Sequence, residues 1–158
     1  MSLPTRAAIA EAVKAELNAA PAGTFDADLW PVGGAVRSRD PLYDLPQLAQ
    51  ARVTVLTKAV DETQASRESV AVETAVDVAV QKKISGPPNS DQALAEGDAL
   101  EVLVEAIIRY MRKRPLAAMP TVTWKSADND PAYIPDHLRE KRVFTSVITF
   151  NYIHGERG

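Results

Sequence analysis

The sequence predicts an α+β fold: a mainly antiparallel β-sheet with a long β-hairpin, and two amphipathic helices packed on one face. A long alternating stretch, shorter β-rich runs on either side of it, and two segments with helical periodicity support this prediction. Strand pairs joined by loops rather than by crossover helices favour antiparallel pairing. The chain has 158 residues and no cysteine. We therefore expect a single domain over residues 1–158, with a core that needs no disulfide.

The alternating stretch from Ser69 to Ser85 is the feature around which the rest of the chain is organised. Its even positions are β-branched and mostly apolar, and its odd positions are small, polar or charged: Val70, Val72, Thr74, Val76, Val78 and Val80 against Ala71, Glu73, Ala75, Asp77, Ala79 and Gln81. Since strand side chains point to opposite faces in turn, this pattern predicts a strand with one buried face. Its length predicts that it extends beyond the core, toward its own hairpin partner or a neighbouring subunit.

A second strand is predicted over residues 52–60, where Val53 and Val55 alternate with Thr54 and Leu56. Residues 61–68 are polar and lack apolar periodicity, so they are expected to connect the two strands. The strands then form a long hairpin in which residues 58–69 are an extended loop. The tip of this loop is expected to be solvated or ordered by a partner.

Two helices are predicted by apolar periodicity. The first spans Pro4 to Asn18, with Ile9, Val13 and Leu17 on one stripe. The second follows the break at residues 86–91, is capped by Ser90 or Asp91 and ends before Pro115. One face of the second helix carries Leu100, Leu103, Val104, Ile107, Ile108 and Met111.

The remaining segments are less regular. Prolines and glycines exclude a continuous helix from residues 25–48, where Leu42, Tyr43, Leu45 and Leu48 are expected to pack on the core. Toward the C-terminus the pattern predicts a strand at 121–124, a turn at 126–131, an irregular or briefly helical segment at 133–139, and a last strand at 143–153.

The sequence offers little catalytic or metal-binding chemistry. His137 and His154 are the only histidines and lack metal-ligand spacing, and Asp128–Asp130 lacks the glycine and glutamate of a calcium loop. Gly33–Gly34 has no phosphate-loop context. We therefore predict no catalytic residue, no cofactor and no metal site. The net charge of −3 does not suggest a nucleic-acid binder, and no apolar run is long enough to span a membrane.

Six short sequence blocks, which follow one another in a particular order along the chain, give the best indication of function. They are Glu16-Leu17-Asn18 after an Ala-rich helix, Tyr43-Asp44-Leu45 followed by Leu48 and Arg52-Val53-Thr54-Val55, Ser66-Arg67, Val80-Gln81-Lys82-Lys83-Ile84, Leu100 to Ile107, and Val143 to Thr149. In this order and spacing the chain resembles the tail-terminator or tail-completion proteins of tailed bacteriophages and prophages, which belong to the neck of the virion.

The resemblance implies an α+β subunit that assembles with its own copies into a closed ring, commonly a hexamer, at the head-proximal end of the tail. Such a ring caps the tail tube protein and meets the head–tail connector or stopper protein. Genomic DNA passes through its channel without specific binding. The resemblance also implies a place in the virion tail or neck, assembly in the host cytoplasm, no catalysis and no membrane partner.

Five charged residues are candidates for the subunit interface or the channel: Arg67, Glu73, Asp77, Lys82 and Lys83. A ring needs head-to-tail contacts that close by rotation, and a long hairpin with an exposed sheet edge can supply them. We expect Glu73 or Asp77, on the polar face of the long strand, to line the channel and repel phosphate.

Two other functional classes remain open. The first is another neck component, such as a head-completion or connector protein. The second is a small-molecule enzyme, although an enzyme would need a convergent cluster of titratable groups that the spacing does not reveal. A nucleic-acid module is disfavoured by the charge.

Overall fold

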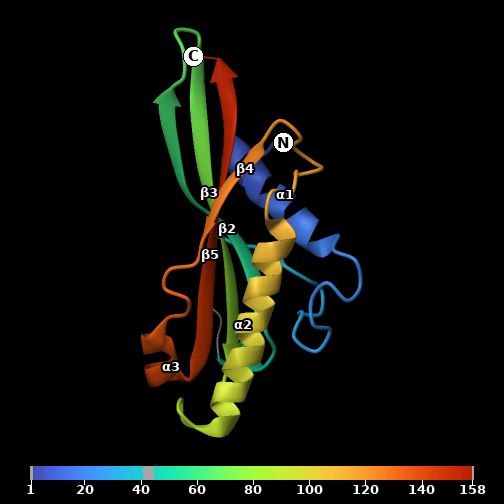
Figure 1. Cartoon of the computed structure of the whole chain (residues 1–158), viewed down its shortest axis with the longest axis vertical. Coiled ribbons are helices and arrows are strands. Elements are labelled where there is room, and N and C mark those ends of the chain that lie inside the picture. The colour runs from blue at the N-terminus through green and yellow to red at the C-terminus, as the bar shows by residue number, and fades with distance from the viewer. Residues whose placement is uncertain (1, 41–44, 158) are drawn as a thin grey trace.

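A computed structural model describes residues 2–40 and 45–157 (Figure 1). In chain order the elements are α1 (Thr5–Asn18), β1 (Val36–Arg37), the 3-10 helix η1 (Leu45–Ala49), β2 (Arg52–Gln64), β3 (Ser69–Lys83), α2 (Asp91–Met111), β4 (Thr123–Asp128), α3 (Pro135–Lys141) and β5 (Val143–Arg157). The predicted packing of Leu42 and Tyr43 and that of the Leu45 side chain lie outside what the structure describes, as does Asp44, whereas Leu48 is buried as expected.

The described strands form one sheet in the order β1-β2-β3-β5-β4. The long alternating strand, β3, lies at its centre and pairs antiparallel with β2 on one side and β5 on the other. Only the short β1 runs parallel to its neighbour, β2. The predicted α+β class with a mainly antiparallel sheet is therefore confirmed.

Both predicted helices cover the same face of this sheet. Val55, Val78 and Ile148 are register partners on neighbouring strands, and all of them belong to the main core cluster. The same cluster takes in Ile9, Val13 and Leu17 from α1, and Leu100, Leu103, Val104, Ile107 and Met111 from α2. The apolar stripes read from the sequence are thus the surfaces that close the core.

The alternation of β3 decides which face is buried. Val72, Thr74, Val76, Val78 and Val80 are buried, as the pattern predicts. The opposite face is half-buried along most of its length. It is fully buried only at the end far from the hairpin turn, where η1 packs on β3. Ala79 and Gln81 are buried there as well.

The hairpin differs from its prediction. Residues 58–69 are not an extended loop, because β2 continues to Gln64 and β3 begins at Ser69. The polar residues from Asp61 to Gln64 pair in register with Glu73 to Val70, after a register shift between Thr57 and Ala59. Pairing uses backbone groups, so a polar segment remains a strand when its partner strand is well formed.

Three further boundaries are corrected by the structure. The strand β4 spans Thr123–Asp128, so part of the predicted turn at residues 126–131 is strand. The helix α3 begins at Pro135 and ends at Lys141, slightly later than the predicted segment. The last strand continues to Arg157 because β3 supplies pairing partners as far as Ser69.

The outer ends of β2, β3 and β5 form a three-stranded projection, which we call the arm (residues 61–72 and 154–157). In Figure 1 the arm extends beyond α1 and β4, at the end of the molecule opposite α3 and the start of α2. The outer part of the arm therefore projects past the helices that cover the rest of the sheet.

Candidate assembly interface

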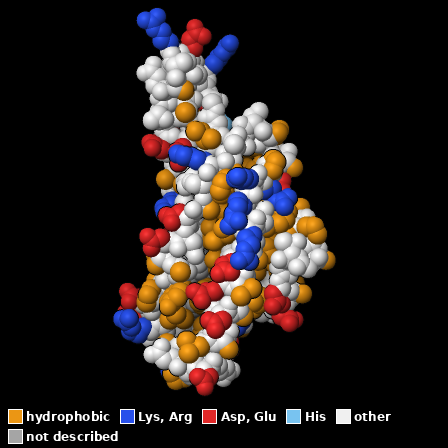
Figure 2. All heavy atoms as spheres, in the orientation of Figure 1, with side chains coloured by type: hydrophobic (Ala, Val, Ile, Leu, Met, Phe, Trp, Pro, Cys, Tyr) orange, Lys and Arg blue, Asp and Glu red, His pale blue; other side chains and the backbone are white. Residues whose placement is uncertain are grey.

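The tip of the arm is a defined turn that presents charged side chains outward. The backbone N–H groups of Ala65 and Ser66 both donate to the carbonyl of Ser69, at 3.1 and 3.2 Å. The hydroxyls of Ser66 and Ser69 are 2.7 Å apart. Arg67 and Glu68 are exposed at this turn, and Figure 2 shows charges of both signs at the end of the arm.

The arm also has unpaired strand edges. Among the described residues β1 covers β2 only near Thr54 and Val55, so β2 has no strand on its outer side from Leu56 to Gln64. On the other side β4 pairs with β5 no further than Ile153, which leaves His154–Arg157 as an open edge. Open edges can accept a strand from another chain, and they promote aggregation when nothing covers them.

Glu73 and Asp77 lie together on the polar face of β3, as predicted, and each has a partner there. The hydroxyl of Thr149 donates to Asp77 Oδ1 at 2.7 Å. Lys125 Nζ donates to Glu73 Oε2 at 2.8 Å, and both side chains remain partly exposed. Lys125 was missed by the sequence reasoning, because it reaches Glu73 from β4, with β5 between the two strands.

A second carboxylate lies next to Glu73. Asp61 of β2 is its direct register partner, on the same face of the sheet. Like charges directly opposite each other on a sheet repel and are unfavourable. The single positive charge of Lys125 neutralises only one of the two carboxylates. The polar face therefore keeps a negative character at the base of the arm.

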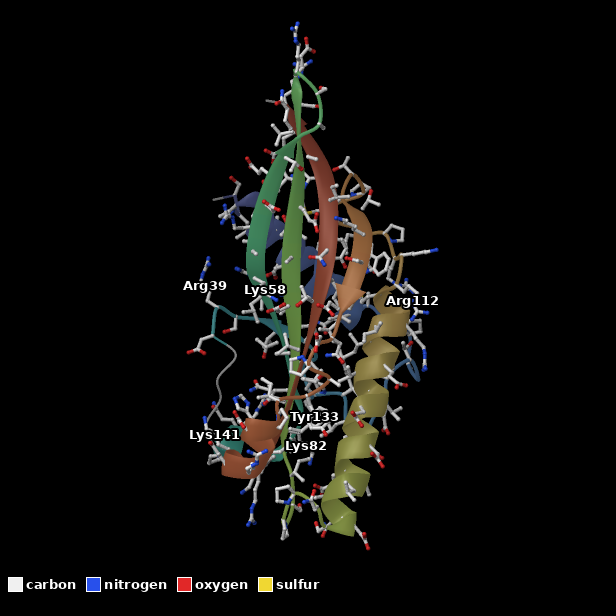
Figure 3. All side chains as sticks on the ribbon, turned by 60° about the vertical axis from the view of Figure 1, so that its left-hand side comes forward. Arg39, Lys58, Lys82, Arg112, Tyr133 and Lys141 are labelled. Carbon is white, nitrogen blue, oxygen red and sulfur yellow. The ribbon has the colours of Figure 1, made fainter. Side chains whose placement is uncertain are left out.

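The two lysines predicted as interface residues lie at the other end of β3. Lys82 is half-buried and its Nζ donates to the carbonyl of Lys83 at 3.3 Å, while Lys83 is exposed. Figure 3 shows Lys82 near α3, far from the arm. The five candidate residues therefore occupy three places, the tip of the arm, the polar face and the opposite end of the sheet, rather than one site.

Beside α3 the helix-covered face has an open hollow of about 520 Å³, which we call the α2–α3 groove. Its floor is apolar, because Ile84 and Phe144 are almost fully buried beneath it. Its sides carry Leu94, Asp98 and Glu101 from α2, and Tyr133, Leu138 and Arg139 from the α3 region. The groove joins apolar surface with charges of both signs.

Gly97 helps to keep this groove open. It lines the hollow from within α2, and a Cβ built on it would meet nothing within 4 Å. Glycine inside a helix costs roughly 0.5–1 kcal/mol relative to alanine. The sequence reasoning did not identify the groove; the glycine within a strongly periodic helix was the signal that could have pointed to it.

The acidic residues and histidines of the described ranges were compared with the needs of a metal site. No group of three or more His, Cys, Asp or Glu residues in ranges 2–40 and 45–157 is placed to hold a metal ion. His154 Nε2 lies 3.0 Å from Glu156 Oε1, and His137 Nδ1 lies 2.8 Å from Thr145 Oγ1. No helix in the same ranges is both long and apolar enough to cross a bilayer.

Comparison with models of known protein families finds no match, and comparison with curated proteins also finds none.

Proposed function

We propose that this protein is a structural component of a phage virion, a tail terminator whose copies form a closed ring, commonly a hexamer. The ring caps the tail tube at its head-proximal end and joins it to the head–tail connector or stopper protein. The observation that carries the proposal is the arm, which projects from the body with open strand edges and a charged tip. The order of sequence blocks described above supports the same class.

A ring requires two different surfaces on each subunit that bind each other and close by rotation. The arm supplies one surface at one end of the long axis (Figure 1), and the opposite end has the α2–α3 groove, a surface of different shape. A symmetric dimer would instead pair one surface with itself. The difference between the two ends favours head-to-tail assembly.

The polar face of the sheet suits the wall of a DNA channel. Asp61, Glu73 and Asp77 place carboxylates on one face of neighbouring strands. Negative charge repels the phosphate backbone and keeps DNA from binding the wall. In this proposal Asp61 and Asp77 contribute most, because the charge of Glu73 is paired with Lys125.

Light scattering after size-exclusion chromatography tests the assembly, and negative-stain electron microscopy of the same fractions tests for a central hole. We expect ring-sized particles from the intact chain. A matched variant lacks the outer part of the arm. Asn-Gly replaces residues 63–71 and closes the hairpin directly after the Glu62–Val72 pair, and the chain is truncated after His154, the residue that pairs with Val72 on the other side. This variant should fold but stay monomeric.

The position in the virion needs a separate readout. Purified protein added to tail tubes that lack their cap should bind one end, where antibody labelling detects it, and should make the tubes competent to join heads. Labelling of heads alone would favour another neck component. A monomer at every concentration would contradict the ring, and substrate turnover by such a monomer would favour the enzyme class.

A further inference from the structure

We propose that the arm tip of one subunit docks into the α2–α3 groove of the next copy, with Arg67 against Asp98 and Glu101 and with Glu68 against Arg139. This inference depends on the self-association proposed above, and it adds the contact through which the copies join.

The groove has the properties of an incomplete binding surface. Leu94 is 52% exposed and Tyr133 is 38% exposed, although both are large apolar side chains beside a buried floor. Asp98 and Glu101 have no ion-pair partner within the described residues. Arg139 has only a long contact of 3.7 Å with Asp136, in which both side chains are more than 70% exposed. The charges of the groove are therefore available to a partner.

The arm tip carries the complementary charges on a narrow turn. Arg67 and Glu68 are adjacent, exposed, and without a side-chain partner among the described residues. Their neighbours Ala65 and Ser66 are small, and the hydrogen bonds of Ala65, Ser66 and Ser69 close the turn. A preorganised tip loses little conformational entropy when it binds.

The occupant of the groove is a second copy, because the tip cannot reach the groove of its own subunit. The two features lie at opposite ends of the long axis (Figure 1). Docking therefore joins copies end to end, and each added copy exposes a new tip and a new groove. Closure into a ring satisfies both, whereas a rotation that does not close would give a filament.

Exposed ion pairs are individually weak and are screened by salt. Packing of Ala65 and the aliphatic stem of Arg67 on the exposed Leu94 and Tyr133 must therefore supply much of the binding, while the charges select the orientation. Closure of a ring stabilises the assembly further, because its last contact forms between subunits that are already held in one particle and therefore at a high effective concentration.

A charge exchange tests the pairing of Arg67 with Glu101. We expect R67E and E101R each to raise the concentration for half-assembly at least about tenfold, a change of about 1.4 kcal/mol, as measured by sedimentation velocity. The double variant R67E/E101R should recover most of the assembly. An equimolar mixture of the single variants should also assemble, because alternation of the two chains makes every contact complementary.

R112E is the matched control, since Arg112 is exposed at the opposite end of α2 from the groove (Figure 3). It makes the same charge change as R67E and should assemble like the parent chain. Raising the salt from about 0.1 M to 1 M should reduce the differences between the charge variants, because the Debye length falls from about 10 Å to 3 Å.

A second test uses shape and not charge. G97L replaces a glycine in α2 by a better helix former and fills the groove, so it should raise the thermal stability of the dilute, unassembled chain and still abolish assembly at higher concentration. G97A should raise stability while assembly is retained, because a methyl group leaves the groove open. A loss of assembly in a more stable protein cannot result from misfolding.

The outcomes separate the two proposals. Rings that form equally well with R67E, E101R and G97L would overturn the docking and leave the terminator proposal intact. Single variants that weaken assembly without recovery in the double variant would overturn the pairing of Arg67 with Glu101. A parent chain that never assembles would overturn the ring itself, together with this contact.

Discussion

Tyr152 is fully buried between the sheet and the helices, yet its hydroxyl has no hydrogen-bond partner among the described residues. Burial raises the pKa of this phenol well above its usual range, and the charge of Glu16 adds to the shift. A buried hydroxyl without a hydrogen-bond partner lowers the free energy of unfolding, because it has lost its hydration. A phenylalanine in place of Tyr152 would have nearly the same shape and would not carry this cost.

We therefore expect Y152F to leave stability unchanged or to raise it by about 1 kcal/mol. Urea unfolding of the dilute chain measures the change. The control is Y133F, at an exposed tyrosine, which should have no effect. A clear loss of stability in Y152F would mean that the hydroxyl has a partner in solution.

Gly34 is required by the way the chain leaves α1. Asn18 Oδ1 accepts a hydrogen bond from the backbone N–H of Ala35 at 2.8 Å, and Asn18 Nδ2 donates to the carbonyl of Ala35 at 3.0 Å. The side-chain amide thus pairs with Ala35 as the backbone of a neighbouring strand would. Gly34 has φ +77°, and a Cβ built on it would lie 2.2 Å from Asn18 Oδ1. A side chain at this position would disrupt the double hydrogen bond.

The neighbouring Gly33 provides a matched comparison. It has φ +87°, but a Cβ added to it would meet nothing within 4 Å. G33A should cost about 1 kcal/mol through backbone strain alone, whereas G34A should cost roughly 2–4 kcal/mol because it adds a clash. Equal losses in thermal unfolding would contradict the role of Asn18.

At the scale of elements, Glu11 connects α1 to the edge of the sheet. It bonds Lys14 in its own helix, and it accepts from Arg37 Nε of β1 at 2.7 Å. The hydrogen bond from Lys14, followed by that from Arg37, lowers the pKa of Glu11 below its ordinary value of 4.5. The carboxylate therefore stabilises the folded state above that value, and the contribution is lost as the pH falls through the lowered pKa.

E11Q should remove this part of the pH dependence. The free energy of unfolding of the parent chain should fall more steeply than that of E11Q as the pH drops below about 4.5. The difference should be modest, because the Glu11 side chain is 36% exposed and solvent screens the pairs. E105Q, at an exposed pair within α2, is the control and should follow the parent chain.

The elements also show what the sequence can predict. Apolar periodicity identified the buried face of β3 and the packing stripe of α2, because burial on one face imposes the pattern directly. Ser90 was one of two proposed caps, and its hydroxyl accepts the N–H of Ala93 at 3.2 Å. These features depend on residues that are close in the chain.

The parts that were missed depend on distant partners. The polar end of β2 is a strand only because β3 pairs with it, and β5 is extended by the same partner. The ion pair of Glu73 with Lys125 and the α2–α3 groove each require elements that are far apart in sequence to lie together. No local pattern encodes such contacts.

At the scale of the whole molecule, the candidate residues are spread along the long axis, with Arg67 at one end and Lys82 and Lys83 at the other. The polar face with Asp61 and Asp77 lies between them. A subunit of this shape can bind its neighbours through its ends while one face borders the channel.

The channel proposal predicts an effect of charge on DNA binding. Parent rings should bind a short DNA duplex no better than a background protein at low salt, as measured by fluorescence anisotropy. D61K/D77K rings should bind it measurably, with an affinity that falls steeply as salt is added. Lack of binding by D61K/D77K rings that are intact would place this face outside the channel. K58E is the control, because it changes an exposed charge of β2 in the opposite direction.

The pairing of Arg157 with Ser69 has a practical consequence. Any polypeptide that follows Arg157 leaves the body next to the hairpin turn. A purification tag or fluorescent protein fused there would crowd the arm tip and interfere with the contact between subunits. The same fusion ahead of α1 would begin nearer the base of the arm. Recombinant material with the label at the two positions should therefore differ in particle size, even though the folded subunit is the same.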